Sequence, residues 1–194
     1  FMHGDVSHIF FNMFGLWMFG TPLEQMWGKK KFIFFYLSTG FGAAALQLLL
    51  YYYQIDYVNT ALNELGLTNP DINNFYSTAE LPTSAINEIG EGSLSSAFNA
   101  YRSVMVGASG ALYGVLVGFA MLFPNAQLML LFPPIPVKAK FLVPILIFAD
   151  LFFGFSSYSI GPIAHFAHVG GAITGLAMMW YWKKNQFDNN RWDS

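Results

Sequence analysis

A serine and a histidine in two apolar segments carry the strongest chemical signal in the sequence. Ser109 lies in the run GASG (107–110), between residues with little or no side chain, and His168 precedes a glycine pair. A hydroxyl becomes a nucleophile when an adjacent imidazole accepts its proton. The simpler alternative is that Ser109 bonds only to a carbonyl one turn earlier, as intramembrane serines commonly do. The segments that position the two side chains decide between these interpretations.

The composition is that of an integral membrane protein. Of the 194 residues, 55% are hydrophobic and 10% are charged, whereas soluble domains average about 25% charged residues. The sequence has no cysteine, which excludes a disulfide framework, a thiolate nucleophile and a cysteine-based metal site. A net charge of −2 argues against a nucleic-acid partner. We expect no cofactor and no metal.

Five apolar segments are long enough, or nearly so, to cross a bilayer. They are residues 6–23, 32–53, 104–123, 141–155 and 163–182. Eight of the nine Lys and Arg residues fall on one side of a simple up-down threading, and the positive-inside rule makes that side cytoplasmic. The expected fold is an all-α polytopic membrane bundle. Its active site would open to the non-cytoplasmic side, and residues 183–194 would form a cytoplasmic tail.

Residues 54–103 break this apolar pattern. They contain six acids and one base, with Pro, Gly, Asn and Ser throughout, so we expect a water-exposed insertion in an otherwise single membrane domain. Ile55, Val58, Leu62 and Leu65 recur at helical spacing, which favours a helix lying on the membrane surface. We expect the insertion to guard access to the site or to bind substrate.

Two strips of small residues predict how the serine and histidine helices meet. Small side chains at four-residue spacing allow close helix contact in a membrane. Contact between the two strips would bring Ser109 within reach of His168, since both lie about six residues into their segments. The strips are formed by Gly110, Gly114 and Gly118 on one helix and by Ala167, Gly171 and Gly175 on the other.

Other groups are placed to stabilise an oxyanion. If a helix begins at Ser109 and the residues before it, Gly107 included, are extended, the Ser109 and Gly110 amides lack helical partners. Such amides can donate to the oxygen of a tetrahedral intermediate. His8 and Asn12, one turn apart on one helical face, are suitable side-chain donors for the same oxygen.

The remaining polar residues leave alternatives open. Tyr113 is placed to stack against the His168 ring, although ordinary aromatic packing explains it equally well. Asp150 lies in a different segment, so a Ser–His dyad is favoured and Asp150 is expected to make a structural hydrogen bond near the outer loop. Depth alone does not exclude Asp150, and a catalytic part for it is the alternative. A metal or haem site from His8, His165 and His168 is disfavoured, because the chain has no His-Glu-x-x-His motif. His165 is expected to line a cavity or bond a loop.

These motifs resemble those of the rhomboid intramembrane serine proteases. The resemblance covers residues 3–182 apart from residues 54–103, and the order and spacing of the motifs make it specific. The matching positions are His3, HIFFN (8–12), Glu24, Gly28, GASG (107–110), Tyr113, AHVGG (167–171) and Gly175. The resemblance implies Ser109 as nucleophile and His168 as base. It also implies oxyanion stabilisation by His8, Asn12 and the Ser109 amide, and a structural role for His3.

The resemblance further implies an endopeptidase that cleaves transmembrane helices of membrane proteins within the bilayer. Residues 141–155 and 156–162 resemble the family's lateral gate and cap. The alternative is an inactive relative that binds or escorts transmembrane helices, but such proteins usually lack the serine or the histidine. We expect a bacterial inner membrane location. The family's first span and its membrane-lying loop have no counterpart in this sequence, so we expect five of six spans here.

Overall fold

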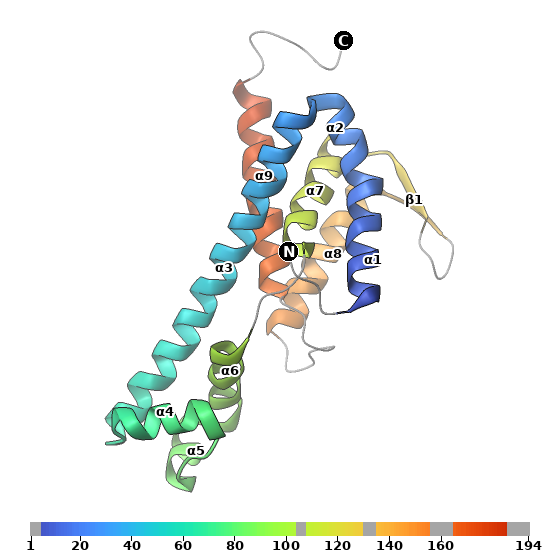
Figure 1. Cartoon of the computed structure of the whole chain (residues 1–194). Helices are drawn as coiled ribbons and strands as arrows, with labels where there is room; N and C mark the ends of the chain where they lie inside the picture. Colours follow the sequence, from blue (N-terminus) through green and yellow to red (C-terminus); the bar gives the residue numbers. More distant parts are fainter. Residues whose placement is uncertain (1–4, 104–107, 130–134, 156–164, 186–194) are drawn as a thin grey trace. The chain divides into compact units, whose positions relative to one another are not determined.

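The structure, a computed structural model, describes residues 5–103, 108–129, 135–155 and 165–185. It divides into two compact units, each mostly helical (Figure 1). The bundle unit comprises residues 1–47 and 106–194, and the inserted unit comprises residues 48–105. Three expectations fall outside the described residues: those for His3, for Gly107 and for the loop 156–162.

The bundle unit begins with a helical path that turns sharply at a glycine. Helix α1 (Val6–Gly15), the π-helical turn η1 (Leu16–Gly20) and α2 (Thr21–Trp27) follow one another directly. Gly28 ends α2 with a φ of 78°, a left-handed conformation that side chains disfavour. The chain then reverses into α3 (Lys29–Glu64), whose first half belongs to this unit.

The second part of the bundle unit carries the other helices. It contains α7 (Ser109–Leu122), α8 (Ala139–Phe155) and α9 (His165–Asn185). The expected all-α bundle is confirmed, apart from a short antiparallel hairpin of β1 (Gln127–Met129) and β2 (Pro136–Lys138). By length and composition, α3 is the single described helix able to cross a membrane, while α7 is apolar but shorter. The count of five spans stays a prediction.

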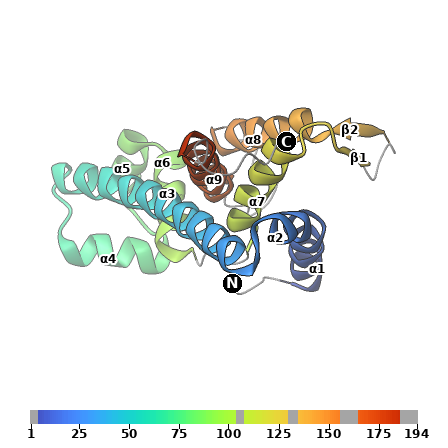
Figure 2. The ribbon, with the colours of Figure 1, turned by 90° about the horizontal axis from the view of Figure 1, so that it is seen from above.

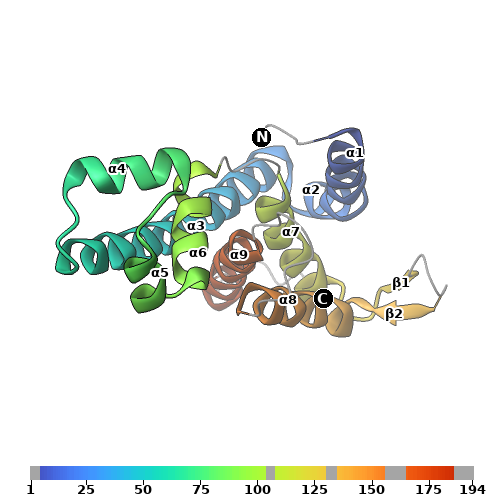
Figure 3. The ribbon, with the colours of Figure 1, turned by 90° about the horizontal axis from the view of Figure 1, so that it is seen from below.

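Helix α7 lies at the centre of the bundle unit. Seen along the bundle, it has α8 and α9 on one side and α2 on the other (Figures 2 and 3). Its buried side chains form the core together with Phe19 and Leu23, Val143 of α8 and Ala172 of α9. A helix enclosed by neighbours can reach high packing density only where their backbones approach closely.

Glycines give α7 and α9 this close approach. A Cβ atom added at Gly171 would overlap the carbonyl group of Gly110, and one at Gly175 would lie 2.8 Å from Cα of Gly114. The two expected strips therefore meet at these positions. The missing Cβ of Gly118 faces side chains of α2 and α3, so contact of Gly118 with α9 stays a prediction.

A threonine joins α3 to α7 on the other side. Thr39 is fully buried, and its Oγ1 is 2.9 Å from the carbonyl oxygen of Tyr36 and 3.2 Å from that of Ala111. One hydroxyl proton can serve only one of these acceptors at a time. The side chain also fills the space left by the missing Cβ of Gly114. Thr39 thus both packs against and hydrogen-bonds with the central helix.

An aromatic cluster lies at the end of α9 opposite to His168. The rings of Trp27 and Trp182 meet edge to face with centroids 5.3 Å apart, and Phe35 contacts both. The ammonium group of Lys31 lies 4.3 Å from the centroid of Trp182, which is within cation–π range. This Trp27–Trp182 cluster connects α2, the start of α3 and the end of α9.

Large apolar side chains cover much of the outside of the bundle unit. On α8 they form a stripe at helical spacing, made of Phe141, Ile145, Phe148 and Phe152, each more than half exposed. Soluble monomers rarely expose a continuous stripe of this kind, whereas a lipid environment stabilises it. The opposite face of α8, which carries Asp150, is therefore directed into the unit.

The inserted unit contains the second half of α3 and three short helices, α4 (Asn69–Thr78), α5 (Thr83–Ile89) and α6 (Glu91–Arg102). Val58 and Leu62 are fully buried there against Phe75, Tyr76 and Ala97. Protein therefore covers the middle of the apolar face that was expected to lie on a membrane surface, while Leu65 at its end is 41% exposed. The composition break at residue 54 does not end the helix either, because α3 continues to Glu64.

Candidate active site

Ser109 and His168 meet where α7 begins. Ser109 is the first residue of α7, and His168 lies in the first turn of α9. The Nε2 atom of His168 is 2.8 Å from the Oγ atom of Ser109, a distance typical of a hydrogen bond. Both side chains are partly buried. This arrangement can transfer a proton from the hydroxyl to the imidazole.

The ring of Tyr113 lies flat against the imidazole of His168. Their centroids are 4.3 Å apart and their planes differ by 5°. Tyr113 follows Ser109 by one turn of α7, so the helix that carries the hydroxyl also supports one face of the imidazole. The stack restricts rotation of the His168 ring about χ2 and keeps Nε2 directed at Oγ.

A carboxylate contacts the other nitrogen of His168, which differs from the favoured two-residue arrangement. Oδ1 of Asp150 lies 3.1 Å from Nδ1 of His168. Asp150 is 7% exposed and projects from α8 toward α9. The sequence interpretation placed it near the outer loop with an unspecified polar partner. A carboxylate therefore lies beside the Ser109–His168 pair, whereas the favoured sequence interpretation was a dyad without one.

His165 shares the same carboxylate oxygen. Its Nδ1 atom is 2.6 Å from Oδ1 of Asp150, and the side chain is buried. Within the described part of the chain, Nε2 of His165 has no hydrogen-bond partner. His165 therefore contacts the Asp150 side chain. The loop that precedes His165 lies outside the described residues, so the expected bond to a loop stays a prediction. The described residues contain no group of three or more potential ligands that could hold a metal ion.

The start of α7 offers amide groups for an oxyanion. Ala108, the residue before the helix, has φ −99° and ψ 3°, and the first bond of the helix runs from the Leu112 amide to its carbonyl over 2.9 Å. The amides of Ser109 and Gly110 precede that bond, so they have no acceptor within the helix. One amide belongs to Ser109, which carries the hydroxyl, and the other belongs to Gly110, the next residue.

Asn12 lies level with this amide group. The missing Cβ of Gly15 faces Leu112, and α1 and α7 run in the same direction (Figure 1). One turn before Gly15 on α1 is Asn12, and one turn before Leu112 on α7 are residues 108–109. Asn12 and the start of α7 are therefore at the same height. Asn12 is buried, and its Nδ2 donates one of its two hydrogens to the carbonyl of His8 over 2.8 Å. Among the described residues, the second N–H of this amide can serve another acceptor.

His8 lies one turn nearer the start of α1, and Asp5 caps that turn. The Asp5 carboxylate accepts from the His8 amide over 2.8 Å and from the Ser7 hydroxyl. These hydrogen bonds hold the pKa of Asp5 below its ordinary value, and the bond from Ser7 has the largest effect. The cap fixes the first turn of α1, from which the half-buried His8 side chain projects.

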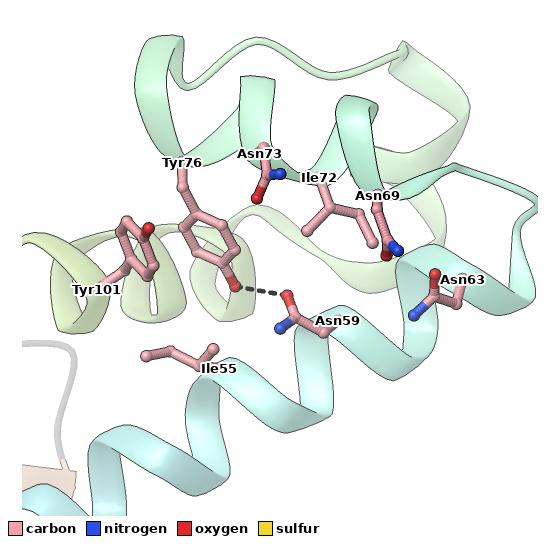
Figure 4. A pocket seen from close by; sticks show the side chains of 8 residues that line it. All are labelled: Ile55, Asn59, Asn63, Asn69, Ile72, Asn73, Tyr76 and Tyr101. Atoms are coloured by element: carbon pink, nitrogen blue, oxygen red, sulfur yellow. Dashed lines mark hydrogen bonds between the residues drawn. The ribbon is translucent and has the colours of Figure 1, made fainter.

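A separate pocket of about 320 Å³ lies in the inserted unit (Figure 4). Asparagines of α3 and α4 line it together with Tyr76, whose hydroxyl lies 2.9 Å from Oδ1 of Asn59. Burial, and to a lesser extent the neighbouring Tyr101, raises the pKa of Tyr76 to about 12. The lining has no charged side chain and no nucleophile paired with a base, so the pocket has no evident catalytic chemistry.

Comparison with known proteins identifies relatives for most of the chain. A family model described as Rhomboid domain matches residues 1–58 and 83–185. Rhomboid protein 1, mitochondrial, of Saccharomyces cerevisiae is 27% identical over 186 residues, which cover 95% of this chain and 40% of the yeast protein. The chain thus spans about two fifths of the length of this relative. No solved structure matches it. Between its two matched parts, the family model leaves out residues 59–82, a shorter stretch than 54–103.

Proposed function

The chain belongs to the rhomboid family, and we propose that it is an intramembrane serine endopeptidase with Ser109 as nucleophile and His168 as general base. Family membership makes it an integral membrane protein. The observation that carries the catalytic proposal is the 2.8 Å separation of Ser109 Oγ and His168 Nε2. Neither residue alone would distinguish a protease from a membrane scaffold.

The proposed reaction proceeds through an acyl-enzyme. Oγ of Ser109 attacks the peptide carbonyl carbon while its proton passes to Nε2 of His168. The tetrahedral intermediate then breaks its C–N bond, and His168 returns the proton to the departing amine. A water molecule attacks the ester and gives a proton to His168, which passes it to the Ser109 oxygen as that oxygen leaves. The products are an amine and a carboxylic acid.

The oxyanion of that intermediate needs donors already in position. We assign the Ser109 and Gly110 amides to this role, because they precede the first bond of α7. The second N–H of Asn12 is the nearest side-chain candidate by its position along the helices, and His8 lies one turn farther out. Removing one such donor typically lowers kcat by about 10²- to 10³-fold. Asn12→Ala should therefore reduce cleavage without abolishing it.

Substrates are proposed to be transmembrane helices of other membrane proteins, cleaved on the non-cytoplasmic side. This deeper assignment draws on the family, the exposed apolar surface and the position of lysines at the opposite ends of the helices. The activity of the whole protein is part of the proposal, because the chain spans about two fifths of the yeast relative. That relative is mitochondrial, so the expected bacterial inner membrane gains no support from it.

The alternative is a relative that binds transmembrane helices without cleaving them. The test is cleavage of a labelled transmembrane-helix reporter by the complete protein in proteoliposomes. We expect Ser109→Ala and His168→Ala to abolish cleavage, while Ser96→Ala, a change in a hydroxyl that only bonds within α6, leaves the rate unchanged. A fluorophosphonate should label Ser109 only when His168 is present. Reporter binding without cleavage by the wild type would support the alternative.

A further inference from the structure

The carboxylate of Asp150 contacts both histidines of α9, and one of them contacts Ser109. We propose that Asp150 is a positioning residue for His168, so that the site operates as a Ser–His–Asp chain with His165 holding the carboxylate in place. This inference rests on the proposed endopeptidase function. It adds a group from α8, a helix that contributes neither the nucleophile nor the base.

The hydrogen-bond pattern selects one tautomer of His168. An ionised carboxylate can only accept hydrogen bonds, so the contact between Asp150 Oδ1 and His168 Nδ1 places the proton on Nδ1. The other nitrogen, Nε2, then carries a lone pair, and it is this atom that lies 2.8 Å from Ser109 Oγ. A general base must present its lone pair to the proton it removes. Asp150 therefore maintains the reactive form of the imidazole.

The same carboxylate is placed to stabilise the product of that proton transfer. When His168 accepts the proton from Ser109, it becomes an imidazolium ion in a mostly apolar bundle. An opposite charge 3.1 Å from Nδ1 favours this charged form, because electrostatic interactions are stronger where water is scarce. The side chain of Asp150 is 9% exposed, so little water weakens the interaction.

His165 explains how the carboxylate keeps its orientation. A buried carboxylate is costly unless several donors satisfy it. His165 provides a donor at 2.6 Å to the same oxygen that His168 uses, and the phenol of Tyr113 also interacts with Asp150. With contacts from two sides, the carboxylate cannot rotate away from His168 without losing its shorter hydrogen bond. His165 thus acts on His168 through Asp150.

A structural role for Asp150 is the competing explanation, and kinetics distinguish the two. Asp150→Asn preserves shape but removes the charge and can present an N–H to His168, which would favour the wrong tautomer. We expect kcat to fall roughly 10²- to 10⁴-fold with KM unchanged, since Asp150 does not reach the substrate. Asp150→Glu should regain part of the loss, because it restores the carboxylate.

The experiment uses the complete protein in proteoliposomes, with kcat and KM measured on the transmembrane-helix reporter and thermal unfolding recorded for each variant. Thr39→Val is the matched control, because it also removes a buried interhelical hydrogen bond, but one that ends on the Ala111 carbonyl rather than on Ser109, His168 or Asp150. It should lower the unfolding temperature with kcat little changed. If Asp150→Asn is folded and cleaves within about threefold of the wild-type rate, the positioning role is refuted while the protease function stands. If the wild type shows no Ser109-dependent cleavage, the proposed function itself fails.

A second measurement covers the case in which Asp150→Asn does not fold. The ¹⁵N shifts of His168 in the wild-type protein report which ring nitrogen carries the proton. Protonated Nδ1 with unprotonated Nε2, and a downfield Nδ1 proton, support the assignment. The opposite tautomer in the wild type would overturn it.

Discussion

A single methyl group at Gly171 is expected to separate the nucleophile from its base. Gly171→Ala places a Cβ atom where the carbonyl group of Gly110 already lies. The carbonyl group belongs to the backbone of α7, and a Cβ atom is held in place by the backbone of α9, so neither can yield by a rotamer change. The clash lies one residue from Ser109 and three from His168, so the adjustment that relieves it occurs within one helical turn of the two reacting atoms.

The size of the effect follows from the contact distances. Non-bonded heavy atoms pack at about 3.5–4.0 Å, and the added Cβ would lie 2.8 Å from the carbonyl carbon of Gly110. Helices α7 and α9 must therefore part by on the order of 1 Å. The same displacement would lengthen the 2.8 Å contact between Ser109 and His168 beyond hydrogen-bond range. A misplacement of about 1 Å can cost on the order of 10²-fold in rate. Overpacking of this kind also lowers stability by about 1–3 kcal/mol.

The assay compares reporter cleavage and thermal unfolding for two matched glycine substitutions. Gly92→Ala is the control, because Gly92 lies in helix α6 and an added Cβ there meets nothing within 4 Å. It should leave cleavage unchanged and, since alanine favours helix, leave the unfolding temperature equal or slightly higher. Wild-type cleavage and stability in Gly171→Ala would refute the close-packing argument.

Three other outcomes are expected. Tyr113→Phe should retain most of the cleavage activity and Tyr113→Leu less, because only phenylalanine preserves the stack on His168. Equal kcat values for the two variants would contradict a role of the stack in catalysis. Thr39→Val should lower the free energy of unfolding by about 1 kcal/mol, as measured by denaturant unfolding in detergent. Thr39→Ser should lower it by less, because serine keeps the hydroxyl that reaches the Ala111 carbonyl. Equal losses in the two variants would contradict this hydrogen bond. Tyr76 should ionise at about pH 12, so a Tyr76→Phe difference titration at 295 nm should lose a late-titrating step. Because the folded form holds this proton after the unfolded chain has released it near pH 10, its contribution to stability should fall as the pH rises from about 10 to 12.

Local sequence patterns were sufficient to predict the beginning of the site. The run of small residues around Ser109 and the glycines after it indicated a helix that starts at the serine and packs closely on another. Helix α7 does begin at Ser109, and Gly171 does meet Gly110. These features depend on short-range spacing and on the absence of side chains, and both can be read directly from the sequence.

The contact of Asp150 was missed because it depends on the rotation of α8 about its own axis. Asp150 was set aside because it lies in a different segment, and depth along the membrane normal could not decide, since depth does not say which way a side chain points. The exposed stripe that includes Phe148 and Phe152 was an available signal. Had that stripe been assigned to lipid, Asp150 would have been placed on the inner face, toward the histidines at three-residue spacing on α9.

The inserted unit was misjudged for a different reason. Low hydrophobicity after residue 54 suggested that the helix ends and that its remaining apolar face needs a membrane. Residues up to 102 instead supply enough apolar surface to cover Val58 and Leu62. Which partner covers an amphipathic face is decided by tertiary contacts, and the periodicity of one segment cannot report it.

The Trp27–Trp182 cluster gives the protein a built-in optical reporter. Trp182 lies fourteen residues after His168 on α9, which is about 21 Å of helix, so its emission is insulated from substitutions at the reacting atoms. It also depends on Lys31, because an ammonium group over an indole alters the local field and the fluorescence. Detachment of α9 from α3 would therefore change the tryptophan spectrum, and the integrity of the helix pair could be followed without an attached dye.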